Sequence, residues 1–516
     1  MKRLVVVLLV VAMLLAVGGT AALVALGSGS EQGAPLDAPT TTPEPGATTP
    51  PRPALAPFYS QQLTWTQCRT TDLCSTLTVP LDYRHPTGDT IELALLKVPA
   101  AHPADRIGSL VVNPGGPGAP GTDYAANADK VFRAPLLDVY DIVGFDPRGT
   151  GSSSPVDCLS DGDLDTFLAR DPDPDTAAEA DDYIAANQAF WRGCAEKSGN
   201  LAAHITTIEA ARDMDVLRAT LGDSQLDYLG ASYGTQLGAT YADLFPDKVG
   251  RLVLDGAIDL SLGTLELGLQ QAAGFETALT SYLQHCVDAG SCFLGDTAEA
   301  GSARITDFLD QVDGQPLETT LGDRVLTEGI ATTGIAFTLY NKSFWPYLTQ
   351  ALQDAFDGDG TLLLRLADSY SSRGQSGYLD NSLEAFPAIS CLDDPSAISE
   401  SEVPAAIARY EAASPTFGRG FAWGATNCGG IQVRATEHDR VIDAKGAAPI
   451  VVIGTTRDPA TPYDWAVHLA AQLDSGVLVS RDGDGHTAYN EGNACIDSAV
   501  EDYLVDGTVP KDGLSC

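Results

Sequence analysis

Positive charge is scarce in this chain of 516 residues. Lysine and arginine together number 30 against 69 aspartates and glutamates, and the formal net charge is −39. That balance excludes a polyanionic partner, so we expect no binding to nucleic acid or to an anionic membrane surface. Histidine is also rare, with seven residues, and no C-x-x-C pair or histidine cluster has the spacing of a zinc site. We therefore expect neither a metal nor a cofactor.

The first 57 residues differ in composition from the rest of the chain. A basic start is followed by the apolar stretch 4–26, which suits a secretory signal and is also long enough to span a bilayer. Residues 1–30 are therefore predicted to be a cleaved signal peptide or a signal anchor. Residues 31–57 contain eight prolines and five threonines, which predicts an extended linker. The body of the protein would be secreted or held at the extracellular face of the membrane or envelope.

Ten cysteines follow the linker, and an even number in an exported chain predicts disulfides. Nearest-neighbour pairing gives Cys68–Cys74, Cys158–Cys194, Cys286–Cys292, Cys391–Cys428 and Cys495–Cys516. Sequence alone leaves this connectivity open.

Short apolar runs alternate with helix-like segments beyond residue 58. Strands are predicted at 75–83, 90–99, 108–112, 141–145, 226–229, 251–254, 449–454 and 476–480. Strands that alternate with helices form right-handed β-α-β units and a mainly parallel sheet. The predicted fold class is therefore α/β.

One pentapeptide, Gly230-Ala231-Ser232-Tyr233-Gly234, has the G-x-S-x-G pattern. It stands between a predicted strand and a helix-like segment, where a serine is held in a strained turn with its hydroxyl exposed. No other serine in the chain has glycine two residues before it and two residues after it. Ser232 is therefore predicted to be a catalytic nucleophile.

An acyl-transfer enzyme also needs backbone amides that bind the developing oxyanion. The loop Asn113-Pro114-Gly115-Gly116-Pro117-Gly118 follows the predicted strand 108–112, and its glycines let the main chain approach a substrate closely. The amides of Gly115 or Gly116 and of Tyr233 are the predicted donors.

The serine needs a histidine base, and the histidine needs a carboxylate that fixes its tautomer. Four histidines follow Ser232: His285, His438, His468 and His486. His486 lies in a glycine-rich loop directly after the predicted strand 476–480, so we expect it to be the base. Asp458 follows the strand 449–454 and is the predicted acid. Asp482 and Asp484 compete, but they lie too close in sequence to reach around the ring of His486.

With these residues assigned, the chain resembles the exported tripeptidyl aminopeptidases of the prolyl-aminopeptidase-like serine peptidases. The motifs that carry the resemblance are Asn-Pro-Gly-Gly-Pro-Gly at 113–118, Asp-Pro-Arg-Gly-Thr-Gly at 146–151, Gly-Ala-Ser-Tyr-Gly-Thr at 230–235, Gly-Thr-Thr-Arg-Asp-Pro-Ala-Thr-Pro at 454–462 and Gly-Asp-Gly-His-Thr at 483–487. Asn113 stands where prolyl aminopeptidases usually carry histidine, which favours the tripeptidyl branch.

The resemblance implies an α/β-hydrolase fold with a largely helical cap. The hydrolase core would take residues 58–258, the cap 259–441 and the C-terminal TAP-like part of the core 442–516. An aminopeptidase must bind a free α-ammonium group, and the acidic residues that the cap offers for this are Glu266, Glu384, Asp393 and Asp394.

The expected function is a serine exopeptidase that releases tripeptides or other short peptides from a free N-terminus, acting as a monomer. The same three residues would also serve a carboxylesterase, a lipase or an envelope protease. A non-catalytic envelope-binding protein on a hydrolase scaffold is the alternative from another class.

Overall fold

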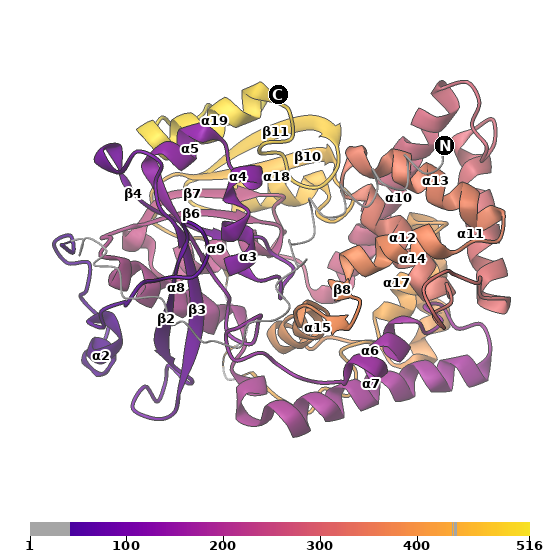
Figure 1. Ribbon diagram of the computed structural model, residues 1–516, viewed down its shortest axis with the longest axis horizontal. Helices are drawn as coiled ribbons and strands as arrows, with labels where there is room; N and C mark the ends of the chain where they lie inside the picture. Colours follow the sequence, from indigo (N-terminus) through magenta and orange to yellow (C-terminus); the bar gives the residue numbers. More distant parts are fainter. Residues whose placement is uncertain (1–41, 436, 438–440) are drawn as a thin grey trace.

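A computed structural model describes residues 42–435, 437 and 441–516 (Figure 1). The predicted signal or anchor segment 4–26, the linker residues 31–41 and His438 lie outside the described residues. Across the described ranges, no helix combines the length and the apolar character that crossing a membrane requires.

The described residues form a ten-stranded sheet. In spatial order its strands are β1 (Thr66–Gln67), β2 (Leu73–Pro80), β3 (Thr90–Val98), β5 (Tyr140–Phe145), β4 (Gly108–Asn113), β6 (Leu226–Ala231), β7 (Val249–Asp255), β10 (Ile450–Arg457), β11 (Gly476–Asp484) and β12 (Leu514–Ser515). Pairing is antiparallel from β1 to β5 and parallel from β5 to β12. All eight predicted strands are present, with ends that differ by up to four residues, and the α/β-hydrolase prediction is confirmed.

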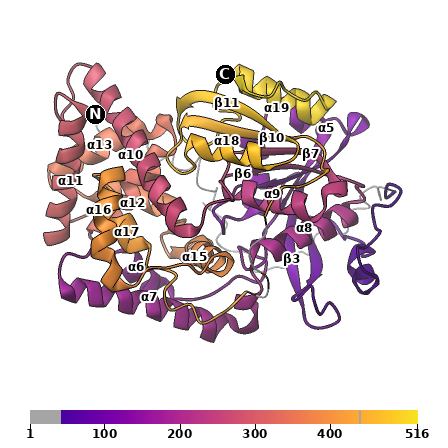
Figure 2. The same ribbon diagram turned by 180° about the vertical axis from the view of Figure 1, so that it is seen from behind.

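Helices cover both faces of this sheet (Figures 1 and 2). One face packs against α8 (Thr207–Leu221), α9 (Tyr233–Leu244) and α18 (Tyr463–Gln472), and the other against α3 (Gly121–Ala126), α4 (Ala128–Val131), α5 (Ala134–Val139) and α19 (Ala494–Asp506). The ends of α8 follow from its sequence, because Thr206 caps its first turn and Gly222 ends it at a φ of 89°.

A helical lobe with its own hydrophobic core lies between β7 and β10 in sequence and to one side of the sheet in space (Figure 1). Its helices are α10 (Thr264–Asp288), α11 (Ala298–Gly314), α12 (Glu328–Leu339), α13 (Trp345–Phe356), α14 (Thr361–Tyr370), α15 (Ser382–Asp393), α16 (Val403–Ala413) and α17 (Gly418–Gly424). A small hairpin of β8 (Arg373–Gly374) and β9 (Gly377–Tyr378) precedes α15.

The helical lobe also receives a second segment of the chain, which the sequence did not reveal. Helices α6 (Asp161–Leu168) and α7 (Ala177–Ser198) follow β5, and α7 runs along the lobe (Figure 1). Tyr183 of α7 packs with Val403 and Trp423 in a small apolar cluster. The lobe is therefore built from two separate stretches of sequence.

Residues 42–57 do not behave as the detached spacer that their composition predicts. Ala47 and Leu55 are buried, and the carbonyl oxygen of Ala47 accepts a hydrogen bond from Arg218 at 3.0 Å. The carboxylate of Glu44 accepts the backbone N–H of Ser224 at 2.9 Å. Specific polar partners at the end of α8 therefore hold this half of the segment on the domain.

The ten cysteines form five disulfides in the sequential order that nearest-neighbour pairing predicts. Cys158–Cys194 joins the loop after β5 to α7, and Cys391–Cys428 joins α15 to the segment after α17. The first bridge therefore fastens the loop after β5 to a helix of the lobe, and the second joins two parts of the lobe itself.

Candidate active site

Ser232 occupies a strained turn between β6 and α9. Its backbone has φ 57° and ψ −124°, which side-chain-bearing residues rarely adopt. The neighbouring glycines are required by space, since a Cβ atom at Gly230 would lie 2.4 Å from the carbonyl oxygen of Gly234. A Cβ atom at Gly234 would lie 2.9 Å from the carbonyl oxygen of Asn113. The turn therefore has the geometry of a nucleophile elbow.

The loop after β4 lies directly against this turn. A Cβ atom at Gly115 would come within 2.8 Å of the Ser232 Cβ and 2.9 Å of the Tyr233 nitrogen. The amide of Gly115, however, already donates to the side-chain oxygen of Asn113 at 2.9 Å, which corrects its prediction as an oxyanion donor. The amides of Gly116 and Tyr233 donate no hydrogen bond to any described residue, so these two remain available.

His486 and Asp458 are in direct contact. The Nδ1 atom of His486 lies 2.9 Å from both carboxylate oxygens of Asp458, and both side chains are almost fully buried. Thr461 donates its hydroxyl to Asp458 at 3.0 Å, and its backbone N–H also donates to that carboxylate at 2.8 Å. This network fixes the ring so that Nδ1 faces the carboxylate.

The other ring nitrogen of His486 is available for proton transfer. Its Nε2 atom is buried and has no hydrogen-bond partner among the described residues. Burial lowers the pKa of His486, but the charge and hydrogen bond of Asp458, together with the charge of Asp255, outweigh burial and raise the pKa above its ordinary value. A neutral ring held in this way can accept a proton at Nε2.

The competing histidines and aspartates are engaged elsewhere. His285 packs against the ring of Trp345 in the helical lobe, and His468 lies on α18 with its Nδ1 atom 2.7 Å from Asp259. The rival acids Asp482 and Asp484 both bind Arg457, at 2.8 Å and 2.6 Å.

Asp255, the last residue of β7, belongs to this site although the sequence did not single it out. Its carbonyl oxygen accepts the N–H of Ser232 at 2.9 Å. Its carboxylate accepts the amides of Ala488 and Tyr489, just beyond His486, at 3.0 Å and 2.9 Å. Burial raises the pKa of Asp255 to about 6. Its position at the carboxyl end of a parallel strand, next to the nucleophile's strand, is the signal that could have identified it.

The four predicted amine-binding acids are not gathered at one point. Each already has partners. Glu266 pairs with Arg409 on the surface, and Glu384 accepts the amides of Cys158 and Leu159. Asp394 accepts the amide of Thr264, and Asp393 accepts the amide and the hydroxyl of Thr207. Asp393 is connected to the side chain of the residue after the nucleophile, because the Thr207 hydroxyl also lies 2.6 Å from the hydroxyl of Tyr233. Burial raises the pKa of Asp393 to about 6.

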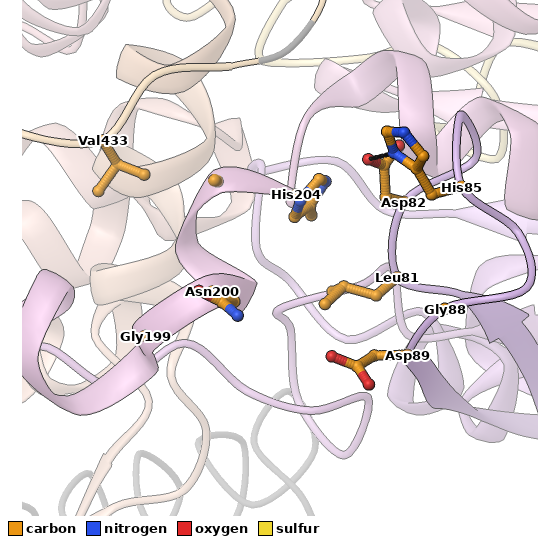
Figure 3. Close-up of a pocket in the computed structure, with 10 residues that line it drawn as sticks. Leu81, Asp82, His85, Gly88, Asp89, Gly199, Asn200, His204 and Val433 are labelled. Carbon is orange, nitrogen blue, oxygen red and sulfur yellow. Dashed lines mark hydrogen bonds and ion pairs between the residues drawn. The ribbon is translucent and has the colours of Figure 1, made fainter.

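A cavity of about 350 Å³ lies elsewhere, between the β2–β3 turn and the segment before α8 (Figure 3). Asp82, His85, Asn200 and His204 are among the residues that line it. None of Ser232, Asp458 and His486 borders this cavity, so its position contributes nothing to the catalytic arrangement.

Comparison with known proteins identifies the family to which this chain belongs. The model of the TAP-like protein family matches residues 414–516, which include Asp458 and His486. The serine protease Hip1 of Mycobacterium tuberculosis is 38% identical over 481 residues, covering 89% of this chain and 92% of that protein. The chain belongs to the TAP-like family of α/β-hydrolases. It is a serine hydrolase, as the sequence predicts.

Two further relatives of this TAP-like hydrolase have different names. Carboxylesterase B of M. tuberculosis is 38% identical over 505 residues, covering 94% of this chain and 95% of that protein. The tripeptidyl aminopeptidase of Streptomyces lividans is 30% identical over 452 residues, covering 86% and 83%. Family membership therefore fixes the class of chemistry and leaves the scissile bond to be decided by experiment.

Proposed function

We propose that this protein is an exported serine exopeptidase that releases tripeptides, or other short peptides, from the free N-terminus of its substrates, acting as a monomer. The observation that carries the proposal is the arrangement of Ser232 at a strained elbow with the buried His486–Asp458 pair and two free amides. The five disulfides support a location outside the cytoplasm, either secreted or at the extracellular face of the envelope.

The reaction would proceed through an acyl-enzyme. The Nε2 atom of His486 takes the proton of Ser232 as its oxygen attacks the substrate carbonyl, and Asp458 stabilises the imidazolium that forms. The amides of Gly116 and Tyr233 bind the oxyanion. His486 then protonates the leaving amine, and a water molecule activated by the same ring hydrolyses the ester on Ser232.

We propose Asp393 as the acid that receives the substrate's α-ammonium group. Asp393 is a half-buried residue, and its carboxylate is linked through Thr207 to Tyr233, the residue that follows the nucleophile. The other three candidates hold helix ends, a loop or a surface arginine, which gives them structural tasks. An exposed aromatic residue of α15, Phe386, lies beside Gly118 of the oxyanion loop and would offer an apolar wall to the peptide.

The competing function is a carboxylesterase with the same catalytic residues, and the relative named Carboxylesterase B is the observation that favours it. The two functions differ in their need for a free amine. A tripeptide nitroanilide with a free N-terminus should be cleaved, and its N-acetylated form should react at least about tenfold more slowly. Equal rates on both substrates would rule out the exopeptidase.

Two matched variants sharpen this test. Asp393→Asn should raise KM for the free tripeptide nitroanilide and leave cleavage of the acetylated form unchanged, because only the first substrate carries the charge that Asp393 binds. Asp394→Asn is the neighbouring control and should have little effect on either substrate. Ser232→Ala should abolish both hydrolysis and labelling by a fluorophosphonate probe; persistent labelling would show that another residue is the nucleophile.

A further inference from the structure

Three carboxylates from three parts of the helical lobe meet at one point, away from the candidate active site. Asp171 lies in the loop between α6 and α7, Asp313 near the end of α11, and Glu328 at the start of α12. One carboxylate oxygen from each lies within 4.8 Å of those of the other two. A fourth acid, Asp173, lies within hydrogen-bonding reach of Glu328.

One oxygen of the Glu328 carboxyl group lacks a partner that would explain its burial. The residue is 6% exposed, and its Oε2 atom is buried without a hydrogen-bond partner among the described residues. The carboxylates of Asp171, Asp173 and Asp313 surround this group, so burial places Glu328 beside like charges. The guanidinium of Arg419 approaches this group and is shared between Asp173, at 3.3 Å, and Glu411, at 3.4 Å. A buried acid held against like charges requires either a proton or a cation.

The ligand atoms of this group indicate which cation it would bind. The side chains of this group offer carboxylate oxygens, which suit hard divalent ions such as Mg2+ and Ca2+. Calcium accepts six to eight oxygens in flexible geometry, and loops with aspartates at alternate positions supply them readily. Asp171 and Asp173 have this alternate spacing. We propose that Asp171, Asp313 and Glu328, with Asp173 beside them, form a calcium-binding site.

Calcium here would connect the two stretches of sequence that build the helical lobe. Asp171 belongs to the insertion after β5, whereas Asp313 and Glu328 belong to the insertion after β7. An ion bound by both stretches stabilises their association, because it binds the folded arrangement and not the separated chain. The site would therefore be structural.

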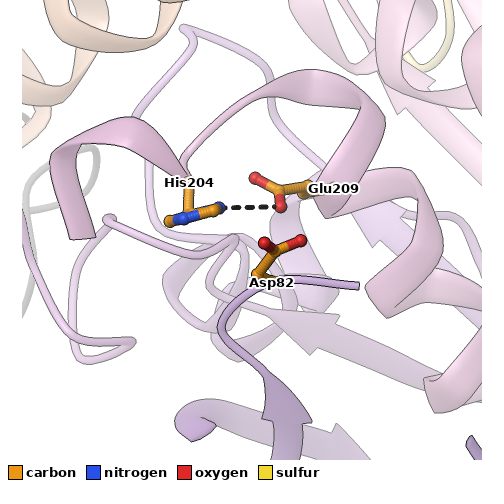
Figure 4. Close-up of side chains that lie close together, drawn as sticks. All are labelled: Asp82, His204 and Glu209. Carbon is orange, nitrogen blue, oxygen red and sulfur yellow. Dashed lines mark hydrogen bonds and ion pairs between the residues drawn. The ribbon is translucent and has the colours of Figure 1, made fainter. Parts of the chain in front are cut away.

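A second group of potential metal ligands differs from the first because its charges have partners. Asp82, His204 and Glu209 also approach one another (Figure 4), and they include an imidazole. Their charges are already balanced: His204 binds Glu209 at 3.0 Å, the buried Arg148 lies 3.7 Å from Glu209, and Asp82 binds Arg84 and His85. This group needs no metal, so we assign none to it.

Calorimetric titration of the full chain, after removal of bound ions with EDTA and dialysis, tests the proposal. We expect one Ca2+ ion to bind per chain, more tightly than Mg2+ under the same conditions. Calcium at a hundred times its dissociation constant should raise the Tm by about 3 °C. No heat of binding together with no change in Tm would overturn the proposal, and Mg2+ binding as tight as Ca2+ would overturn the assignment to calcium.

Single substitutions locate the ion. Asp313→Asn changes an exposed residue that the fold tolerates, and Glu328→Gln keeps the shape of the buried side chain; each should weaken calcium binding about tenfold or more. Asp307→Asn, at another exposed position of α11, is the control and should bind calcium like the unmodified chain. Unchanged affinity in Asp313→Asn and Glu328→Gln would place any bound calcium elsewhere. These readouts do not depend on peptidase activity, so they stand apart from the proposed function.

Discussion

The carbonyl oxygen of Tyr340, the residue that follows α12, accepts the backbone N–H of His486 at 2.7 Å. The two rings also meet edge to face, with their centroids 5.4 Å apart. The helical lobe therefore does more than cover the sheet, because one of its residues holds the loop that carries the proposed base.

Replacing Tyr340 should disturb catalysis through His486. Tyr340→Ala removes the ring contact, and we expect kcat/KM on a cleaved nitroanilide to fall about tenfold, the value of one good aromatic pair. Tyr340→Phe keeps the ring and should retain most of the activity. Thermal unfolding of both variants would separate a catalytic loss from a loss of stability, and full activity in Tyr340→Ala would contradict this role.

The acid of the triad can be tested against its nearest rival. Asp458→Asn preserves the shape of the side chain but favours the wrong tautomer of His486, so kcat should fall about 10⁴-fold. Asp482→Asn changes an exposed acid that binds Arg457 and should leave kcat within about twofold. A large loss in Asp482→Asn with a small loss in Asp458→Asn would reverse the assignment.

The pH dependence of kcat/KM should report His486 and its neighbour Asp255. The protonated ring cannot accept the serine proton, so activity should fall as the pH drops through the pKa of His486, which lies above the ordinary 6.5. The negative charge of Asp255 contributes to that raised pKa. Asp255→Asn removes the charge, so the acid limb of the profile should move to lower pH.

Asp259→Asn provides the comparison for this shift, because Asp259 binds His468 and not His486. Its profile should coincide with that of the unmodified enzyme. An acid limb that stays in place in Asp255→Asn would show that this carboxylate acts only by holding the amides of Ala488 and Tyr489.

Two glycines with similar backbone conformations offer a matched pair. Gly115 has φ 95° and Gly290 has φ 85°, but an added Cβ at Gly115 would lie 2.5 Å from the carbonyl oxygen of Ala231, whereas Gly290 faces open space. Gly115→Ala must displace the elbow and should reduce kcat/KM about a hundredfold or more. Gly290→Ala should cost about 1 kcal/mol of stability and leave kcat/KM unchanged. Equal activity in the two variants would place the Gly115 loop outside the site.

The sequence predicted those parts of the site that depend on local pattern and chain order. Ser232 has a motif that fixes its backbone, while Asp458 and His486 each follow an apolar run at the same edge of the sheet. The sequence did not predict a role for Asp255, because no local pattern distinguishes this acid from the others in a chain that contains 69 acidic residues. Its carboxylate accepts the amides of Ala488 and Tyr489, which follow it in the chain by 233 and 234 residues.

The helical lobe was less predictable for the same reason. Three of its features depend on tertiary packing between distant segments. They are the contact of Tyr340 with His486, the packing of α7 on the lobe, and the approach of Asp171 to Asp313 and Glu328. The occupied amide of Gly115 depends on the rotamer of one asparagine side chain. Nothing in the local pattern of residues specifies any of these contacts.

The segment that follows His486 in the chain closes the sheet beside the strand that leads to this proposed base. Strand β12 pairs with β11, and Cys516 is bridged to Cys495, so the C-terminus closes the edge beside the strand that leads to His486. Ser232 precedes its proposed base, His486, along the chain, and the helical lobe lies between them in sequence. Incomplete chains, and chains cut short by proteolysis before residue 486, would carry the nucleophile without the means to activate it. Proteolysis between Ser232 and His486 would therefore separate the nucleophile from its proposed base and end hydrolysis.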